Sequence, residues 1–259
     1  MSPEGVGQGR PVQPLVSVVM PAYNAERTLA ASMQSVLAQG HANLELLVVD
    51  DCSRDATRAI IEGAAAVDRR VVPLRQPSNA GVAAARNAAL EAASGVYVAF
   101  LDSDDRWHAG KLEAQLAFMR ESGTQVCYAS YRRVDGRGKA LSIVTPPRRI
   151  DYQGMLRSNW IGNLTGIYDR RVGEFRFQRV GHEDYAFWLQ VVRQAGEAHR
   201  LPDPAAVADY LVRDGSLSAD KLAAARWQWH IYRHVERLGR ARASWYFVNY
   251  AARAAVKRC

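Results

Sequence analysis

The stretch "YVAFLDSDDRWHAGKL", residues 97–112, joins an apolar run to a cluster of acids. The run is typical of a buried strand, and it ends abruptly in Asp102, Asp104 and Asp105. Carboxylates this close together repel one another, and each resists burial unless it is paired or bound to a metal ion. Three of them at the mouth of a core strand therefore indicate a functional site.

The sequence before this stretch alternates apolar strands with helical segments. The strands are continuous apolar runs, which is typical of a parallel sheet covered on both faces by helices. The chain is therefore predicted to be an α/β protein. Expected strands occupy residues 15–20, 44–50, 70–76 and 96–102, and expected helices 29–39, 55–66 and 81–93.

Polar side chains follow the first, second and fourth of these strands. Ligands of parallel sheets bind beyond the carboxyl ends of the strands. We therefore expect a binding site at one edge of the sheet, formed by residues that include Tyr23, Asn24, Asp50, Asp51, Asp102 and Asp104.

The regular alternation weakens after residue 112. The pattern predicts a loop at 135–149 and two terminal helices at 219–238 and 242–258. Further helices are expected at 111–122 and 183–194, and strands at 125–134, 163–172 and 206–213.

Composition and charge narrow the class of protein. The chain has 259 residues, of which 48% are hydrophobic and 23% charged, as in soluble globular proteins. It has no apolar run long enough for a transmembrane helix, and its polar start at 1–14 is expected to be a flexible leader. Three widely spaced cysteines favour a reducing cytosol over a disulfide framework.

The positive charge is concentrated at the end of the chain. Residues 221–259 hold nine Lys or Arg and one acid, which equals the whole net charge of +8. Aromatic residues lie between these bases, a pattern typical of helices that bind an anionic membrane surface. The same helices could instead pack on the domain through one aromatic face, and both can hold. We do not expect a nucleic-acid partner.

An Asp-x-Asp motif at a strand end suits a hard divalent cation. Mg²⁺ and Mn²⁺ are held through one or two carboxylates, with water and substrate phosphates completing the shell. The cation would also remove the mutual repulsion of the acids. A helix cap or a solvated turn would explain a single Asp, but explains three poorly.

Five segments together resemble family 2 glycosyltransferases of the GT-A fold. They are "VSVVMPAYNAERTL", "LLVVDDCSRDAT", "NAGVAAARNAAL…SGVYVAFLDSDD", "W…KL" and "GHEDYAFWL", in the order of the family. The resemblance covers residues 15–215, with a nucleotide-sugar half at 15–112 and an acceptor half at 113–215. It implies a Rossmann-like, mostly parallel central sheet flanked by helices, followed by C-terminal amphipathic helices at 216–259.

The resemblance also implies roles for residues of the nucleotide-sugar half. Asp51, with Asp50 beside it, would read the uracil edge. Asp102 would approach the ribose and the metal, and Asp104 would bind the Mn²⁺ or Mg²⁺ ion directly. Arg86 would face the diphosphate or lie on the surface. The remaining nucleotide-binding residues implied are Pro21, Ala22, Tyr23, Asn79 and Gly81.

The catalytic base of the family matches "HED" at 182–184. Inversion requires a carboxylate that takes the proton of the acceptor hydroxyl, and Asp184 is our candidate, supported by Glu183. The alternative is that these acids only open a helix. The segment before the base, with Trp160, Asn163 and His182, is expected on the acceptor side. Arg213 and Lys221 are weaker candidates for the diphosphate.

The resemblance therefore implies an inverting, metal-dependent glycosyltransferase. It would move a sugar from a nucleotide-sugar, a UDP-hexose, to a glycan or lipid-linked acceptor in bacterial O-antigen, capsule or lipopolysaccharide synthesis. Its expected location is the cytoplasm, with peripheral contact on the inner face of the membrane. Two rivals are a non-catalytic sugar-nucleotide binder and a nucleotidyltransferase, but the latter needs a Gly-rich phosphate loop that "PAYNAERT" lacks.

Overall fold

The computed structural model describes residues 13–203, 205–212 and 221–256. Most of the expected leader, the loop containing Arg213 and the last three residues lie outside this range. The backbone of Lys221 is described as the first residue of a helix.

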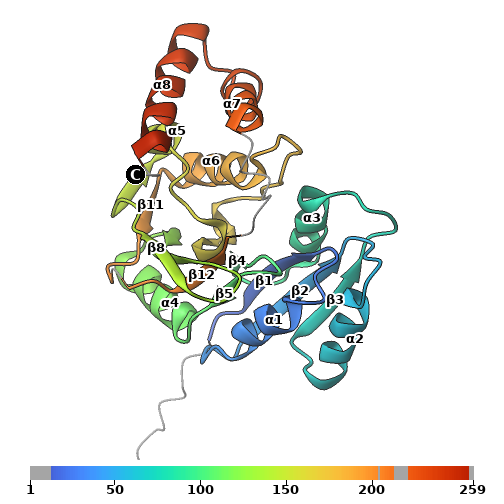
Figure 1. The fold of residues 1–259 in the computed structure, drawn as a ribbon. Helices are drawn as coiled ribbons and strands as arrows, with labels where there is room; N and C mark the ends of the chain where they lie inside the picture. Colours follow the sequence, from blue (N-terminus) through green and yellow to red (C-terminus); the bar gives the residue numbers. More distant parts are fainter. Residues whose placement is uncertain (1–12, 204, 213–220, 257–259) are drawn as a thin grey trace, which may run out of the picture.

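An eight-stranded sheet forms the centre of the molecule (Figure 1). Its strand order is β3-β2-β1-β4-β10-β6-β11-β9. The first four strands are parallel, and β10 runs antiparallel to both β4 and β6. The two halves expected from the sequence thus share one sheet. Its strands are β1 Val16–Ala22, β2 Leu44–Asp50, β3 Val71–Arg75, β4 Tyr97–Phe100, β6 Val126–Tyr128, β9 Arg149–Asp151, β10 Ile167–Asp169 and β11 Glu197–Arg200.

Alternate residues of the central strands enter two separate cores. Val19 and Phe100 face the core that contains α3 and α6, whereas Val18 and Ala99 face the core that contains α1 and α4. Both faces are buried, which is why these strands lack alternation in the sequence. The helices are α1 Leu29–Leu37, α2 Thr57–Val67, α3 Val82–Ala92, α4 Lys111–Ser122 and α6 Glu183–Ala195, each within three residues of its predicted bounds.

Two predictions for residues 125–149 were wrong. The strand expected at 125–134 breaks into β6, in the main sheet, and β7 (Tyr131–Val134), in a second sheet. The loop expected at 135–149 contains β8 (Ala140–Val144), which pairs antiparallel with β7. Four of the five β8 side chains are exposed, so this strand carries no apolar signal. The second sheet has the order β5-β12-β7-β8, with β5 Arg106–Trp107 and β12 Ala208–Leu211.

The strand expected at 163–172 was also wrong in its extent, since only three of these residues form a strand. The segment holds β10 between two 3₁₀ turns, Asn163–Thr165 and Arg170–Val172. Gly166 lies between the first turn and β10, where a Cβ atom would be 2.1 Å from the Trp188 ring. The chain is therefore shaped here by close packing against α6 rather than by strand pairing alone.

The ring of Phe100 connects β4 to α6. It makes edge contacts with Phe177, Phe187 and Trp188 at 5.5, 5.2 and 5.7 Å between ring centres. Phe177 in turn stacks on Phe187 at 4.2 Å. These aromatic contacts hold the start of α6 near the carboxyl end of β4, although 83 residues of sequence separate Phe100 from Glu183.

The C-terminal helices pack on the domain through one face. They are α7 (Lys221–His230), a π-helical turn (Ile231–Val235) and α8 (Arg240–Val256), next to α5 (Tyr152–Arg157) and α6 (Figure 1). Tyr232 donates its hydroxyl hydrogen to the carbonyl of Leu156 in α5. The packing alternative predicted for the aromatic tail is therefore confirmed. Within the described ranges, no helix is both long and apolar enough to cross a bilayer.

Lys111, the first residue of α4, is buried without a hydrogen-bond partner for its ammonium group among the described residues. Its Nζ lies 3.9 Å from the centre of the Trp107 ring. Burial lowers the pKa of Lys111 to about 7. Between that pH and the ordinary pKa of 10.5, the unfolded chain binds one proton more than the folded one. Stability therefore rises with pH across this window and is lowest below it.

Replacing Lys111 by Met removes the buried charge with little change of side-chain length. We expect Lys111→Met to raise the melting temperature at pH 6.5, by roughly 2–4 °C for each kcal/mol that it adds to the free energy of unfolding. The increase in melting temperature should be smaller at pH 9.5, where Lys111 is neutral in the folded wild-type protein. Thermal unfolding at several pH values measures this, with the exposed Lys139→Met as control. A gain of equal size at every pH would contradict the argument.

Candidate active site

The carboxyl ends of β1, β2 and β4 bring the predicted acids to one edge of the sheet. Ala22 of β1 pairs with Asp50 of β2, and Val19 of β1 pairs with Phe100 of β4. The backbone N–H of Asp51 donates to the carbonyl of Ala22 at 2.9 Å. The convergence expected from the strand pattern is therefore present.

Asp51 holds the loop before α3. Its two carboxylate oxygens accept the backbone N–H groups of Ala80 and Gly81 at 2.9 and 2.8 Å. Gly81 has a φ of +88°, a backbone conformation that glycine adopts readily and that residues with a side chain rarely adopt. The neighbouring Asp50 is 2% exposed and accepts the N–H of Ser53 at 3.0 Å. Both acids thus shape loops around the site, a role that the motif alone did not predict.

The other residues predicted to bind the nucleotide line the same edge. Pro21 and Ala22 are buried as the last two residues of β1, and Tyr23 follows them with 45% of its surface exposed. Asn79 is exposed in the loop that Asp51 holds.

Arg86 is buried against Asp102, so the surface alternative for this residue was wrong. Its Nη2 donates to Oδ1 of Asp102 at 2.6 Å, and its guanidinium lies 5.1 Å from the centre of the Phe177 ring. Burial lowers the pKa of Arg86, but the negative charges of Asp102, Asp184 and Glu183 more than offset this and raise it above its ordinary value. The guanidinium therefore stays charged in the presence of all three acids.

The turn after β4 fixes the acids in place. Asp105 is 2% exposed, and its carboxylate accepts the backbone N–H of Leu211 in β12 at 2.9 Å. Asp104, which lies between Asp102 and Asp105 in the sequence, is half-buried. Burial raises the pKa of Tyr210 to about 12, with the charges of Asp105, Asp102 and Asp104 as further causes. The phenol of Tyr210 therefore lies in the negative field of this cluster and stays protonated at neutral pH.

A cavity of about 550 Å³ lies between this turn and the start of α6. Asp102 and Arg86 line it together with Asp184 and Glu183, so the sheet edge and the predicted base share one cavity. Asp184 is half-buried in the first turn of α6, and its Oδ2 accepts the amide hydrogen of Asn159 at 3.3 Å. Asn159 itself was not predicted, although it lies in the segment expected on the acceptor side, because no motif distinguishes it from its neighbours.

The predicted acceptor-side residues divide into two groups. Asn163 and His182 line the cavity with Asp184. Trp160 lines a different depression, with Arg149 and Arg157, and is not brought to the cavity. The sequence placed all three in one segment before the base. The neighbours Asn159 and Ile161 do line the cavity, so Trp160 differs from them in the depression that its side chain lines.

The acids fit a divalent metal ion. Oxygen ligands on Asp102 and Asp104 suit Mg²⁺ or Mn²⁺ better than a soft metal. Within the described parts of the chain, no three His, Cys, Asp or Glu side chains gather closely enough to enclose a metal by themselves.

The sequence of the chain matches a known family over most of this region. The model of the family described as glycosyl transferase family 2 matches residues 17–174. The chain belongs to glycosyl transferase family 2. It is therefore a glycosyltransferase, as predicted.

Relatives within the family align over nearly the whole chain. A putative teichuronic acid biosynthesis glycosyltransferase, TuaG of Bacillus subtilis, is 38% identical, over 95% of this chain and 98% of TuaG. The Escherichia coli enzyme WfgD, a UDP-Glc:alpha-D-GlcNAc-diphosphoundecaprenol beta-1,3-glucosyltransferase, is also 38% identical, over 84% of this chain and 85% of WfgD.

Solved structures of glycosyltransferases share the fold. S. aureus TarS in complex with UDP-GlcNAc has a TM-score of 0.70 at 24% identity, over 91% of this chain and 71% of TarS. The mannosyltransferase PcManGT from Pyrobaculum calidifontis, in complex with GDP-Man and Mn²⁺, has a TM-score of 0.67 at 20% identity, over 95% of this chain and 75% of that protein. Both are GT-A glycosyltransferases, which confirms the predicted fold.

The loop held by Asp51 offers a test of the site's construction. We expect Asp51→Asn to lose about 1–3 kcal/mol of unfolding free energy, because one of the two backbone N–H groups then faces the NH₂ group of the amide, which cannot accept a hydrogen bond. Denaturant unfolding measures this. Asp135→Asn is the control, since Oδ1 of Asp135 accepts the N–H groups of both Arg137 and Lys139 at 2.9 Å, and the oxygen of the asparagine amide can accept them in the same way. Equal losses in the two variants would refute the special role of Asp51.

Proposed function

We propose that this glycosyltransferase moves a sugar from a nucleotide-sugar donor, a UDP-hexose, to a lipid-linked saccharide, with inversion at the anomeric carbon. The observation that carries the proposal is that Asp184 and Asp102 line one cavity. The relatives support the substrate classes, because WfgD is named for UDP-glucose and a diphosphoundecaprenol acceptor, and TuaG for teichuronic acid biosynthesis. Bacterial surface polysaccharide synthesis is therefore the proposed process.

The acceptor half of the reaction requires a base. In our proposal the carboxylate of Asp184 takes the proton of the acceptor hydroxyl as that oxygen attacks the anomeric carbon. The Asn159 amide donates to Oδ2 of Asp184, which keeps the carboxylate oriented. Glu183 adds negative charge beside it, and both acids benefit from the N-terminal end of the α6 dipole.

The donor half of the reaction requires compensation of charge on the departing nucleoside diphosphate. Asp102 and Asp104 would hold Mn²⁺ or Mg²⁺, which when bound supplies positive charge to the diphosphate oxygens. Arg86 orients Asp102 through their ion pair. Pro21, Ala22, Tyr23, Asp50, Asp51, Asn79 and Gly81 are the proposed binding residues for the nucleoside.

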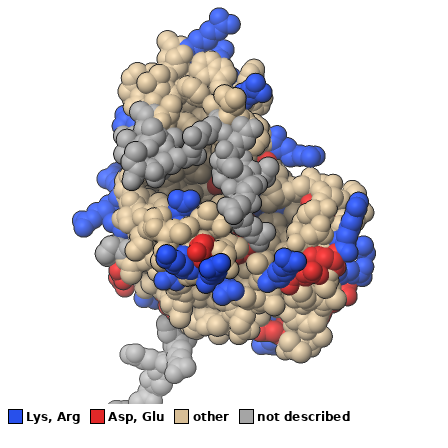
Figure 2. Space-filling model, in the orientation of Figure 1, with Lys and Arg blue, Asp and Glu red and all other residues tan. Residues whose placement is uncertain are grey.

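The exposed face of α8 supports a peripheral contact with an anionic membrane. Ala243 and Tyr246 are buried against the domain, whereas Trp245 and Val248 on the other side are 51% and 66% exposed. Arg242, near the start of the helix, is exposed as well. In the view of Figure 2, the tip of the α7–α8 pair carries basic side chains and no acidic ones. Such a face suits the headgroup region of a bilayer.

The proposed base can be tested by a conservative exchange. We expect Asp184→Asn to bind UDP as wild type does but to lose transfer by about 10²–10⁴-fold, because the amide cannot accept the proton. Glu183→Gln should lose less, since it only supports the base. Calorimetry with UDP and a sugar-transfer assay with Mn²⁺, repeated with a chelator, measure both steps. Near-normal turnover in Asp184→Asn, or full activity without metal, would refute the mechanism.

The membrane contact can be tested by substitutions of exposed residues on α8. We expect the double variant Trp245→Glu, Val248→Glu to bind phosphatidylglycerol vesicles at least about tenfold more weakly, because two apolar side chains leave the lipid and two like charges oppose it. Vesicle sedimentation measures this. Val67→Glu is the control, since Val67 is 87% exposed on α2. Unchanged binding in the double variant would contradict the contact.

A further inference from the structure

The C-terminal helices close one side of the catalytic cavity. Trp227 and Gln228 of α7 and Tyr250 of α8 line it together with Asp184. Both helices lie beyond the segment that matches the family, which ends at residue 174. Their contribution to the cavity is therefore a feature that the family match does not describe.

Trp227 packs against the two residues that precede α6, the helix that carries the predicted base. Its indole makes an edge contact with His182 at 5.5 Å between ring centres. A Cβ atom on Gly181 would lie 2.2 Å from the same indole, so the ring rests on the backbone two residues before Glu183. Trp227 is half-buried, and it forms part of the cavity wall.

Two polar groups of the cavity wall have no hydrogen-bond partner within the described chain. The Nδ2 of Asn163 is buried and unpaired, and Asn163 as a whole is 7% exposed. Its orientation is set, because Oδ1 accepts the indole N–H of Trp188 at 3.2 Å, which leaves Nδ2 as the free donor. The Nε2 of His182 is likewise buried and unpaired. Such groups cost about 1–3 kcal/mol each unless a ligand pairs with them.

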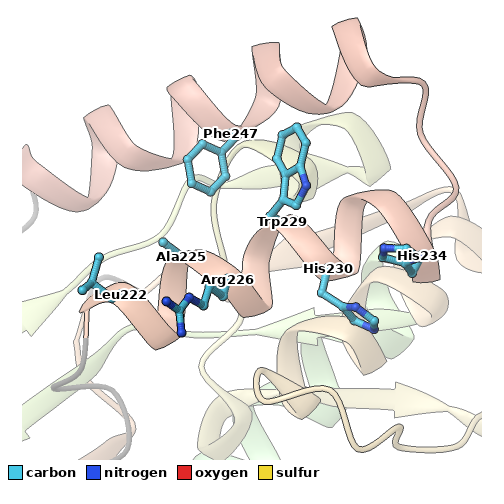
Figure 3. Close-up of a pocket in the computed structure, with 7 residues that line it drawn as sticks. All are labelled: Leu222, Ala225, Arg226, Trp229, His230, His234 and Phe247. Atoms are coloured by element: carbon cyan, nitrogen blue, oxygen red, sulfur yellow. The ribbon is translucent and has the colours of Figure 1, made fainter.

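The opposite side of α7 faces away from this cavity. Figure 3 shows Trp229 pointing from α7 towards Phe247 of α8, and the two rings meet edge to face at 5.8 Å. Trp229 lines the groove between the two helices and is absent from the lining of the catalytic cavity. The two tryptophans of one helix therefore have separate environments.

We propose that Trp227, His182 and Asn163 form the subsite for the acceptor sugar. The indole of Trp227 takes the apolar C–H face of a pyranose ring, and the unpaired nitrogens of His182 and Asn163 take its hydroxyl groups. This combination of one aromatic surface and a few placed polar groups is typical of a specific small-ligand site. The sugar would then be held beside Asp184, where the reacting hydroxyl loses its proton. The inference rests on the proposed transfer to a saccharide acceptor.

The test separates the acceptor from the donor. The donor probe is UDP-glucose, whose slow hydrolysis by water needs no acceptor, and the acceptor probe is a synthetic α-GlcNAc-diphosphoryl lipid. We expect Trp227→Ala to raise the KM for the acceptor about tenfold while the KM for UDP-glucose in hydrolysis stays within about twofold. Trp227→Phe, which keeps a ring, should recover most of the acceptor affinity. Trp229→Ala is the matched control and should leave both constants unchanged.

His182→Phe adds a second variant that keeps a ring against Trp227 but removes Nε2. It should also raise only the acceptor KM. Thermal unfolding of each variant identifies loss of folding. Three results would overturn the subsite. The first is an unchanged acceptor KM in Trp227→Ala, and the second is an equal loss of hydrolysis and transfer in that variant when it is folded. The third is a wild type that hydrolyses UDP-glucose but transfers nothing to this acceptor. A wild type without hydrolysis or transfer would instead refute the proposed function.

Discussion

The ion pair between Arg86 and Asp102 is the interaction on which the active site depends. Several carboxylates surround one cavity, and without a buried positive charge their mutual repulsion would oppose folding of the sheet edge. Arg86 is 5% exposed, and its pKa is raised by Asp102, Asp184 and Glu183 together. One guanidinium on α3 thus links the acids after β4 with those that open α6.

Aromatic packing gives this electrostatic arrangement its geometry. Phe177 touches both the guanidinium of Arg86 and the ring of Phe100, so the ion pair and the contact between β4 and α6 share one side chain. Asn87 of α3 also exchanges two hydrogen bonds with the backbone of Phe177, at 2.9 and 2.7 Å. The segment before the base is therefore held to α3 by polar and apolar contacts at the same point.

In our proposal the C-terminal helices combine two functions. One side of the α7–α8 pair lines the catalytic cavity with Trp227, while the outer face of α8 presents Trp245 to the surroundings. A lipid-linked acceptor has its saccharide and its lipid at opposite ends. Helices that contact a sugar on one side and a bilayer on the other would hold such a substrate in one orientation.

The sequence by itself determined the α/β class, the parallel strands, the edge where the acids gather and the family. These features depend on apolar runs and local motifs, which are continuous in the chain. The tertiary structure alone decided that Arg86 is buried, that Asp51 holds a loop, that Trp160 lies apart, and that Asn159 and Trp227 reach the cavity. Each of these facts depends on contacts between segments distant in sequence, and β8 escaped prediction because its exposed strand carries no apolar pattern.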